Sequence, residues 1–216
     1  FLRAAVPAHK DGPVWAVAAS PDGKRVATGG RDHAVKVWDV SKPRPTLVAT
    51  LTGHEDSVRG LAFAPDGGRL YSVGRDDGTL RAWDVGTDKP KAAGATAVGG
   101  RLVGVAVAPD GKTVATSGSD GAALRPITES GVGAAVPLDS DNKPVLTVAF
   151  APDGGSVLGV VGLSETEDRV LVWAADGKRL HEFKFGMHVH AAGFVPDGRH
   201  VVVVTESQTL VVRLPR

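Results

Sequence analysis

The sequence of 216 residues contains no cysteine and a single methionine, and only 5% of its residues are aromatic. Without cysteine it can have no disulfide framework, thiolate metal site or cysteine nucleophile. No apolar run approaches the roughly 18–20 residues that span a bilayer, and the first residues do not resemble a signal peptide. The formal net charge is only +1, so no whole-protein field would recruit nucleic acid or an acidic membrane. We predict neither membrane insertion nor nucleic-acid binding.

Catalytic motifs are also missing from the sequence. It contains no P-loop, dinucleotide fingerprint or Gly-x-Ser-x-Gly elbow. His188 and His190 could begin a metal site, but no third ligand can be named, and ordinary strand histidines are the favoured interpretation. The acidic turns at 139–142 and 165–168 lack the glycine and the distal glutamate of a calcium loop. We therefore predict no catalytic, cofactor-binding or metal-binding residues.

What the sequence does contain is a Pro-Asp-Gly phrase that occurs five times. Its prolines lie at steps of 44, 44, 43 and 44 residues, at Pro21, Pro65, Pro109, Pro152 and Pro196. Each phrase lies between two short apolar runs, and because proline presets φ and Asp-Gly completes a turn, each forms a β-hairpin. A hairpin that recurs at a fixed period above forty residues indicates a repeat architecture.

Further short strands follow each hairpin, as in Val35-Lys36-Val37, where apolar and polar residues alternate. Four strands per repeat is the number in a propeller blade, and no helical pattern occurs. We predict an all-β fold, a β-propeller of about five four-stranded blades in a single domain, residues 1–216. The repeats run approximately over 7–51, 52–96, 97–138, 139–185 and 186–216.

The fifth repeat shows only three strands, whereas residues 1–6 form a strand without a repeat of its own. We expect strand 1–6 to complete the last blade and close the ring, since pairing the two ends removes exposed sheet edges. The alternative, that the chain is a contiguous piece of a larger ring or a partial propeller, stays open.

The third strands of the first two repeats end in Trp38-Asp39 and Trp83-Asp84, and Gly53-His54 precedes the second repeat. The period, the turn phrase and these dipeptides resemble the WD-repeat β-propeller family across essentially the whole chain. The resemblance implies a polar network inside a blade, formed by His, Ser or Thr, Asp and Trp. Carried over to this sequence, the network residues are His9, Thr28, Asp32 and Trp38, and His54, Ser72, Asp77 (with Asp76 as the alternative) and Trp83. The third and fifth repeats place Pro126 and Arg213 at the Trp position.

In WD-repeat relatives, partners contact residues just inside the first strand and just before the turn Asp. The resemblance therefore implies a partner-binding face, with the candidates Trp15, Arg31, Arg59, Arg75 and His190. Aromatic and basic side chains are enriched in interface hot spots, so we predict a non-catalytic scaffold that binds a partner protein or an acidic peptide. The alternative is a lactonase-like propeller hydrolase with a metal in the central channel, but the innermost strands are mostly apolar. The abundant Gly, Ala and Val are typical of GC-rich bacterial genomes; compartment and oligomeric state cannot be read from the sequence.

Overall fold

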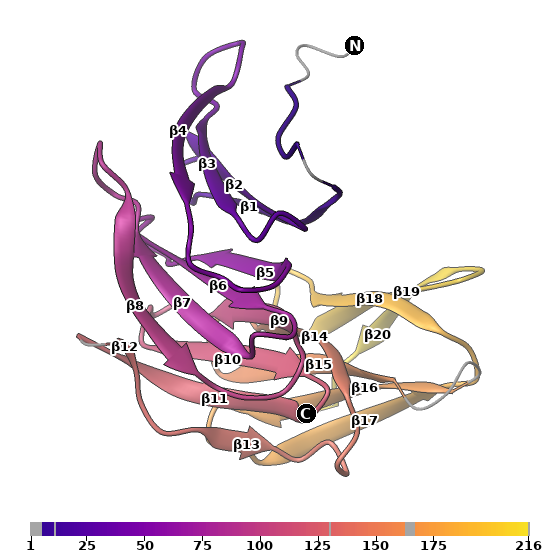
Figure 1. The fold of residues 1–216 in the computed structure, drawn as a ribbon. Coiled ribbons are helices and arrows are strands. Elements are labelled where there is room, and N and C mark those ends of the chain that lie inside the picture. Colours follow the sequence, from indigo (N-terminus) through magenta and orange to yellow (C-terminus); the bar gives the residue numbers. More distant parts are fainter. Residues whose placement is uncertain (1–5, 11, 130, 163–166, 216) are drawn as a thin grey trace.

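The computed structural model describes residues 6–10, 12–129, 131–162 and 167–215. Throughout these residues the regular structure is β-strand, and none of them forms a helix that could cross a membrane. The strands form five antiparallel sheets that follow one another along the chain. Figure 1 shows the sheets fanned around an arc in chain order, as the blades of a β-propeller are.

The first two sheets each have four strands. Blade 1 consists of β1 (Val14–Ala19), β2 (Arg25–Gly30), β3 (Val35–Asp39) and β4 (Thr46–Leu51). Blade 2 consists of β5 (Val58–Phe63), β6 (Arg69–Gly74), β7 (Thr79–Asp84) and β8 (Lys91–Ala97). Within each blade the strands pair in sequence order, so the first strand and the fourth strand form the two edges of the sheet.

The next three sheets vary this plan. Blade 3 consists of β9 (Leu102–Val107), β10 (Thr113–Gly118), β11 (Gly121–Thr128), β12 (Gly131–Val132) and β13 (Val136–Leu138). Blade 4 consists of β14 (Val145–Phe150), β15 (Ser156–Gly162), β16 (Asp168–Ala174) and β17 (Arg179–Phe185). Blade 5 consists of β18 (Val189–Phe194), β19 (His200–Thr205) and β20 (Thr209–Arg213).

Each Pro-Asp-Gly phrase is the turn between the first and second strands of a blade. Its glycine has φ between +66° and +74°, a conformation that favours glycine. The aspartate carboxylate accepts an N–H two residues further on, as Asp22 does from Lys24 at 3.0 Å. A Cβ on Gly67, Gly111, Gly154 or Gly198 would lie 3.6–4.0 Å from the proline Cδ of the preceding turn. The five turns therefore lie one against the next along one side of the propeller.

The hydrophobic core is divided among the interfaces between consecutive blades. One cluster of buried side chains joins blades 1 and 2, with Val37 packed among residues that include Leu61 and Trp83. Corresponding clusters join blades 2 and 3, blades 3 and 4, and blades 4 and 5. The innermost strands β1, β5, β9, β14 and β18 contact one another in this order. Each blade is therefore stabilised by its neighbours along the chain, as expected for a repeat protein.

The structure differs from the sequence prediction in the outermost strand of blade 3, and it does not test the predicted pairing of residues 1–6. Blade 3 departs from the predicted four strands, because its outermost strand is split into β12 and β13, which pair with different halves of β11. Pro137 in β13 lacks the N–H of a regular ladder residue. The strand predicted over 1–6 lies outside the described residues, apart from Val6, which is not in a strand. Its pairing with β20 stays a prediction, and blade 5 has three strands in the described structure.

Candidate functional site

Four side chains form a hydrogen-bonded chain through blade 2. Trp83 Nε1 donates to Ser72 Oγ at 2.8 Å, His54 Nε2 lies 2.7 Å from the same hydroxyl, and His54 Nδ1 lies 2.7 Å from Asp77 Oδ2. Trp83, Ser72 and His54 are buried. Burial lowers the pKa of His54, and the hydrogen bond to Asp77 only partly opposes this shift. A neutral imidazole can accept from the hydroxyl and donate to the carboxylate, which satisfies the buried polar groups.

The same arrangement recurs in blade 1. Trp38 Nε1 donates to Thr28 Oγ1 at 3.0 Å, His9 Nε2 lies 2.9 Å from this hydroxyl, and His9 Nδ1 lies 2.6 Å from Asp32 Oδ1. The His9 side chain is completely covered. This network fixes the segment before β1 against the side of blade 1. The structure thus brings together each of the two sets of four residues named from the sequence.

In blade 3 an arginine takes the place of the tryptophan. Arg125 lies opposite Val114, as Trp38 lies opposite Val26 in blade 1, and Arg125 Nη1 donates to Thr116 Oγ1 at 2.9 Å. The prediction that Pro126 stands at this position is wrong by one residue. The reason is the turn between β10 and β11, which is shorter than the corresponding turns of blades 1 and 2.

A similar correction applies to blade 5. Val212, not Arg213, lies opposite Val201 and therefore occupies the tryptophan position there. Both corrections arise because the distance from the Pro-Asp-Gly turn to the third strand depends on the length of the intervening turn. Blade 5 consequently has an apolar side chain where blades 1 and 2 have a hydrogen-bond donor.

One residue near the start of each innermost strand lies at a β-bulge. At these points the pairing with the neighbouring strand skips one residue. The skipped residues are Trp15, Arg59, Val103, Leu146 and His190. A bulge leaves its extra residue out of the ladder and re-aims the side chain. Three of the five predicted partner-binding residues therefore occupy positions that the sheet does not use for its own pairing.

The other two candidates lie in turns tied to the same rim. The N–H of Arg31 donates to the carbonyl of Pro13, and the N–H of Arg75 donates to the carbonyl of Ser57. Each of these carbonyls belongs to the residue just before the innermost strand. These bonds hold the turns between the second and third strands beside the bulges. We use the term basic rim for the part of this edge formed by Trp15, Arg31, Arg59 and Arg75.

A cation–π contact joins blades 1 and 2 within the basic rim. The guanidinium carbon of Arg59 lies 3.8 Å from the centroid of the Trp15 ring, and Trp15 remains 45% exposed. Within the described residues, Arg59 Nε is buried without a hydrogen-bond partner. Burial and, after it, the charge of Arg75 lower the pKa of Arg59. Arg59 is thus oriented by an aromatic ring and held close to a second cation.

Sequence reasoning missed a further arginine at this place. Arg101 precedes β9, and its Nε donates to Asp76 Oδ1 at 2.6 Å. Its charge also contributes to the lowered pKa of Arg59, whereas the carboxylates of Asp56 and Asp76 oppose that shift. The basic rim is therefore surrounded by charges of both signs. The sequence feature that could have identified Arg101 is its position directly before an innermost strand.

His190 lies at the far end of the arc, three blades from Arg59, so the structure separates it from the basic rim. Its ring packs edge-on against His188 at a centroid distance of 5.1 Å. His188 Nδ1 lies 2.7 Å from Asp168 Oδ2, a buried carboxylate of blade 4 that also accepts the N–H of Val189. Among the residues that the structure describes, no three His, Asp or Glu side chains are grouped to hold a metal ion.

Comparison with known proteins agrees with the repeat and the fold. The family model for the WD domain, G-beta repeat, matches residues 2–39 and 45–84, which contain β1–β3 and β4–β7. The chain is a β-propeller whose residues 2–39 and 45–84 are WD40 repeats. Among solved structures, the β-propeller domain of Cps50 (Swd1) from Myceliophteria thermophila superposes with a TM-score of 0.79 at 17% identity. The Kuenenia stuttgartiensis hydrazine synthase superposes with a TM-score of 0.80, also at 17% identity. At this level of identity the similarities show the fold of the chain alone.

Curated sequence relatives match about a fifth of the chain. The nuclear distribution protein PAC1 of Coccidioides posadasii is 47% identical over 45 residues, and the protein HIR1 of Cryptococcus neoformans is 34% identical over 55 residues. The match spans 21% of this chain in both cases, but 9% of PAC1 and 6% of HIR1. In the two structures, the chain covers 67% of the Cps50 domain and 56% of the hydrazine synthase chain.

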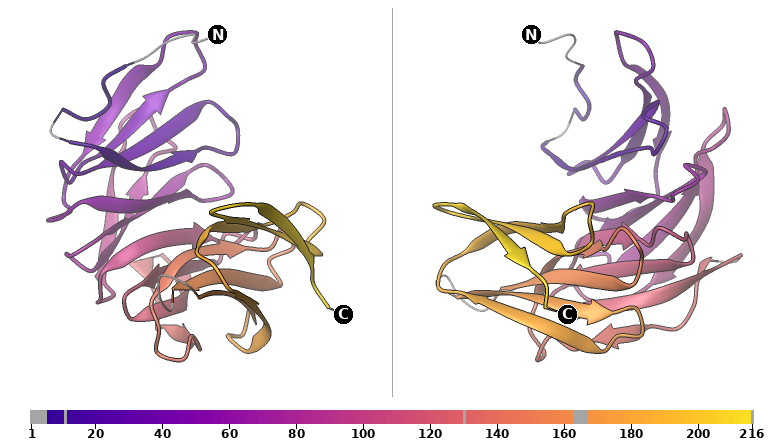
Figure 2. Two further views of the ribbon diagram at one scale, coloured as in Figure 1. Left: turned by 90° about the vertical axis from the view of Figure 1, so that its right-hand side faces the viewer. Right: turned by 180° about the vertical axis from the view of Figure 1, so that it is seen from behind.

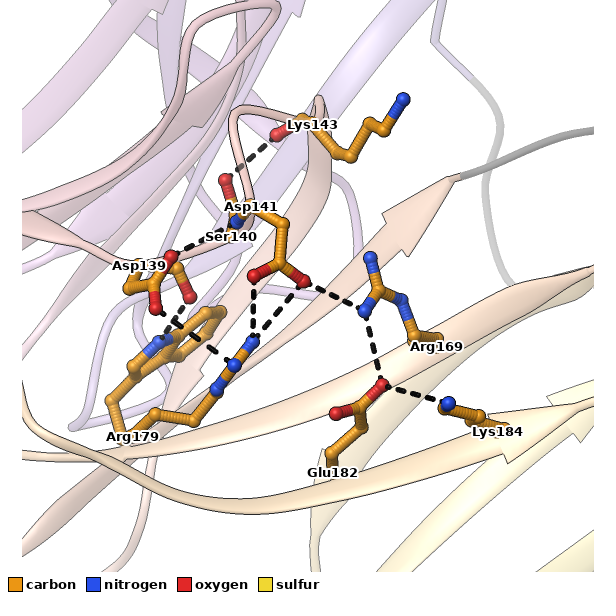
Figure 3. A network of polar contacts seen from close by, with 9 residues as sticks. Asp139, Ser140, Asp141, Lys143, Arg169, Arg179, Glu182 and Lys184 are labelled. Atoms are coloured by element: carbon orange, nitrogen blue, oxygen red, sulfur yellow. Dashed lines mark hydrogen bonds and ion pairs between the residues drawn. The ribbon is translucent and has the colours of Figure 1, made fainter.

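The acidic turn after β13 is a charge-paired connection between blades 3 and 4 of the WD40 propeller. Figure 3 shows Asp141 between two arginines: Arg169 Nη1 donates to Asp141 Oδ2 at 2.8 Å and Arg179 Nη1 lies 3.2 Å from both carboxylate oxygens. Hydrogen bonds from Arg169 and Arg179 lower the pKa of Asp141. Trp173 donates to the carbonyl of Asp139 at 2.9 Å, where the tryptophans of blades 1 and 2 donate to a hydroxyl. These contacts have a structural role, because they fix the connection to blade 4.

Proposed function

We propose that residues 1–216 form a single WD-repeat propeller domain that binds a partner protein or peptide and is not an enzyme. WD40 domains generally bind proteins. The proposed contact surface is the basic rim, with His190 as an outlying contact along the same edge. The observation that supports this surface is the stack of Arg59 on Trp15 at 3.8 Å, formed by two bulge residues that the strand pairing does not need.

The chemistry of the basic rim favours an acidic partner. Arginine forms bidentate hydrogen bonds with carboxylates, and a guanidinium already held against an indole loses less conformational freedom on binding. Arg75 is close enough to Arg59 for its charge to lower the pKa of Arg59. A carboxylate placed between them would relieve this repulsion. Tryptophan and arginine are also the residue types that dominate interface hot spots.

The alternative function, a metal-dependent propeller hydrolase, requires carboxylates or histidines from several innermost strands. These strands instead carry apolar residues such as Val17, Leu61 and Val148. Metal analysis of the purified protein distinguishes the two functions. A stoichiometric bound ion would favour the hydrolase, and a chain that binds partners without one would favour the interaction module.

The test combines affinity capture of partners with a direct binding assay. A fluorescent peptide rich in Asp and Glu is titrated with the wild-type chain and with the variant Trp15→Ala, Arg59→Ala, Arg75→Ala. We expect the triple variant to bind at least tenfold more weakly, since loss of one hot spot costs about 2 kcal/mol or more. Binding by the wild type should also weaken as salt is raised, because exposed charges are screened.

The matched control removes two positive charges from the opposite side of the propeller, at the Pro-Asp-Gly turns. Lys112→Ala and Arg199→Ala should leave the affinity unchanged, because both follow turn aspartates and lie away from the basic rim. Equal affinities of the wild type and the triple variant for the peptide and for captured partners would contradict the proposed surface. An equal loss of affinity in the control variant would show that the effect arises from net charge alone.

A further inference from the structure

A pocket of about 220 Å³ lies on blade 3, beside the hydrogen bond from Arg125 to Thr116. Its walls come from β10, β11, the segment before β9 and the segment around β13. The lining residues that bear on its chemistry are Gly100, Thr116, Asp120, Ala123, Arg125 and Pro137. All residues of the lining lie between Val98 and Pro137, so neither end of the chain contributes to this pocket.

Blade 3 leaves this space because it has a small side chain where the two preceding blades have long ones. Ala123 lies opposite Thr116. The same register position holds Lys36 in blade 1 and Arg81 in blade 2. The Lys36 ammonium extends to the segment before β1, where it donates to the carbonyl of Ala8 at 2.7 Å. The side chain of Ala123 ends at a methyl group, so this side of blade 3 stays open.

The histidine of the polar network is also replaced in blade 3. His54 stands four residues before β5, whereas Val98 stands four residues before β9. In blade 2 the serine hydroxyl lies between the tryptophan N–H and the imidazole of His54. Among the described residues, the Thr116 hydroxyl accepts from Arg125 and donates to no protein group. The hydrogen of this hydroxyl is therefore available for a ligand in the pocket.

Arg125 is a partly buried cation in an interior blade of the arc (Figure 2), and it has no carboxylate partner among the described residues. Its contact there is with the neutral hydroxyl of Thr116, at 2.9 Å. Burial lowers the pKa of Arg125, and no neighbouring charge of the described chain contributes to that shift. A buried charge is unfavourable unless it is paired, so an anion beside this guanidinium would be stabilising. Nη1 is used by Thr116, which leaves Nε and Nη2 for a bidentate contact.

We propose that this pocket binds a small monocarboxylate, with the carboxylate on Arg125 and a short carbon chain against Ala123 and Pro137. Arg125 can hold both oxygens of a carboxylate, and the Thr116 hydroxyl can donate to one of them. The small apolar side chains of the lining suit a carbon chain. The charge of Asp120 in the same lining disfavours a dianion such as phosphate. In the described structure none of the four basic-rim residues lines the pocket, so the proposal is independent of partner binding.

Propionate is the probe, titrated into the isotope-labelled protein at constant ionic strength and followed by heteronuclear NMR. We expect saturable shifts of the Arg125 Nε–H signal and of backbone N–H signals in β10 and β11. The melting temperature should also rise with the propionate concentration, because a ligand that binds only the folded state stabilises it. Sodium phosphate, titrated in the same way, should cause no saturable shift at Arg125.

Two variants remove the site in different ways. Arg125→Gln removes the charge but keeps an amide that can donate to Thr116, so propionate should bind at least about tenfold more weakly. Ala123→Met fills the pocket and keeps the charge, and it should abolish the shifts. The long side chains at this position in blades 1 and 2 indicate that the fold tolerates it, which circular dichroism checks. Arg44→Gln, at an exposed arginine between β3 and β4, is the control and should bind propionate like the wild type.

Three results would overturn the proposal. The first is the absence of a saturable propionate shift at Arg125 in the wild type. The second is an affinity of Arg125→Gln or Ala123→Met equal to that of the wild type, because the carboxylate would then bind elsewhere. The third is phosphate binding as tight as that of propionate, since the pocket would then recognise charge alone. The peptide assay of the basic rim changes other residues, so the failure of one proposal is distinguishable from the failure of the other.

Discussion

Replacement of Trp83 by phenylalanine tests the polar network of blade 2 most directly. The indole is 1% exposed, and its N–H donates to Ser72 Oγ, which is fully buried. Phenylalanine keeps an aromatic ring in the core but removes the donor and part of the ring volume. Ser72 keeps its contact with His54 at 2.7 Å, so the hydroxyl loses one of two partners rather than both.

The magnitude follows from these two losses. A buried polar group that loses a partner costs about 1–3 kcal/mol, and the contact that remains places Ser72 in the lower half of that range. The smaller ring leaves a cavity that costs about 1 kcal/mol more. We therefore expect Trp83→Phe to lower the free energy of unfolding by about 2–3 kcal/mol.

Urea denaturation followed by far-UV circular dichroism measures this loss without depending on tryptophan fluorescence. Trp15→Phe is the control and should change the free energy of unfolding by less than about 0.5 kcal/mol, because Trp15 is largely exposed. A double-mutant cycle with Ser72→Ala should give a coupling energy of about 1 kcal/mol. A Trp83→Phe protein as stable as the parent, or a cycle with no coupling, would refute the network as a source of stability.

Two further predictions concern pH and packing. The pKa of His54 is lowered in the folded state. Below about pH 6.5 the unfolded chain therefore takes up a proton that the folded chain does not. The free energy of unfolding should accordingly decrease as the pH falls through this range. Urea midpoints at pH 7.5 and 5.5 should therefore differ more for the wild type than for His54→Gln. Equal differences in the two proteins would show that His54 does not cause the pH dependence of stability. Gly60→Ala should cost about 1–3 kcal/mol, because its Cβ would lie 2.8 Å from the Val73 side chain and 3.1 Å from the backbone nitrogen of Val105 in blade 3. Gly193→Ala, whose Cβ would meet nothing within 4 Å, is the thermal-denaturation control and should be near neutral.

The fold was predictable because its main signals are local. Each Pro-Asp-Gly phrase forms a turn by its own backbone preferences, and each apolar run beside it forms a strand, so the period alone defines five sheets. The positions of Trp38 and Trp83 were readable for the same reason. Positions that lie beyond a turn of variable length could not be predicted by counting residues. Counting from the turn proline placed Pro126 where Arg125 lies.

The repeat positions of the candidate residues could be predicted from the sequence, but the contacts between them could not. Counting from the turn prolines singled out Trp15 and Arg59, yet the count could not show that both are bulge residues, because a bulge is a property of two paired strands. Nor could it show the contact between them, which crosses from one blade to the next. His190 shares their repeat position but lies three blades from Arg59 and four from Trp15.

The bulges at the start of the innermost strands also determine which side chains these positions can hold. One structural position holds tryptophan, arginine, valine, leucine and histidine in the five blades, at Trp15, Arg59, Val103, Leu146 and His190. Since the ladder skips this residue, its identity is not constrained by strand pairing. The side chain at this position can therefore change one blade at a time while the Pro-Asp-Gly turns and the interblade clusters keep the scaffold constant. The same five positions are natural sites for engineering a new binding surface into this protein.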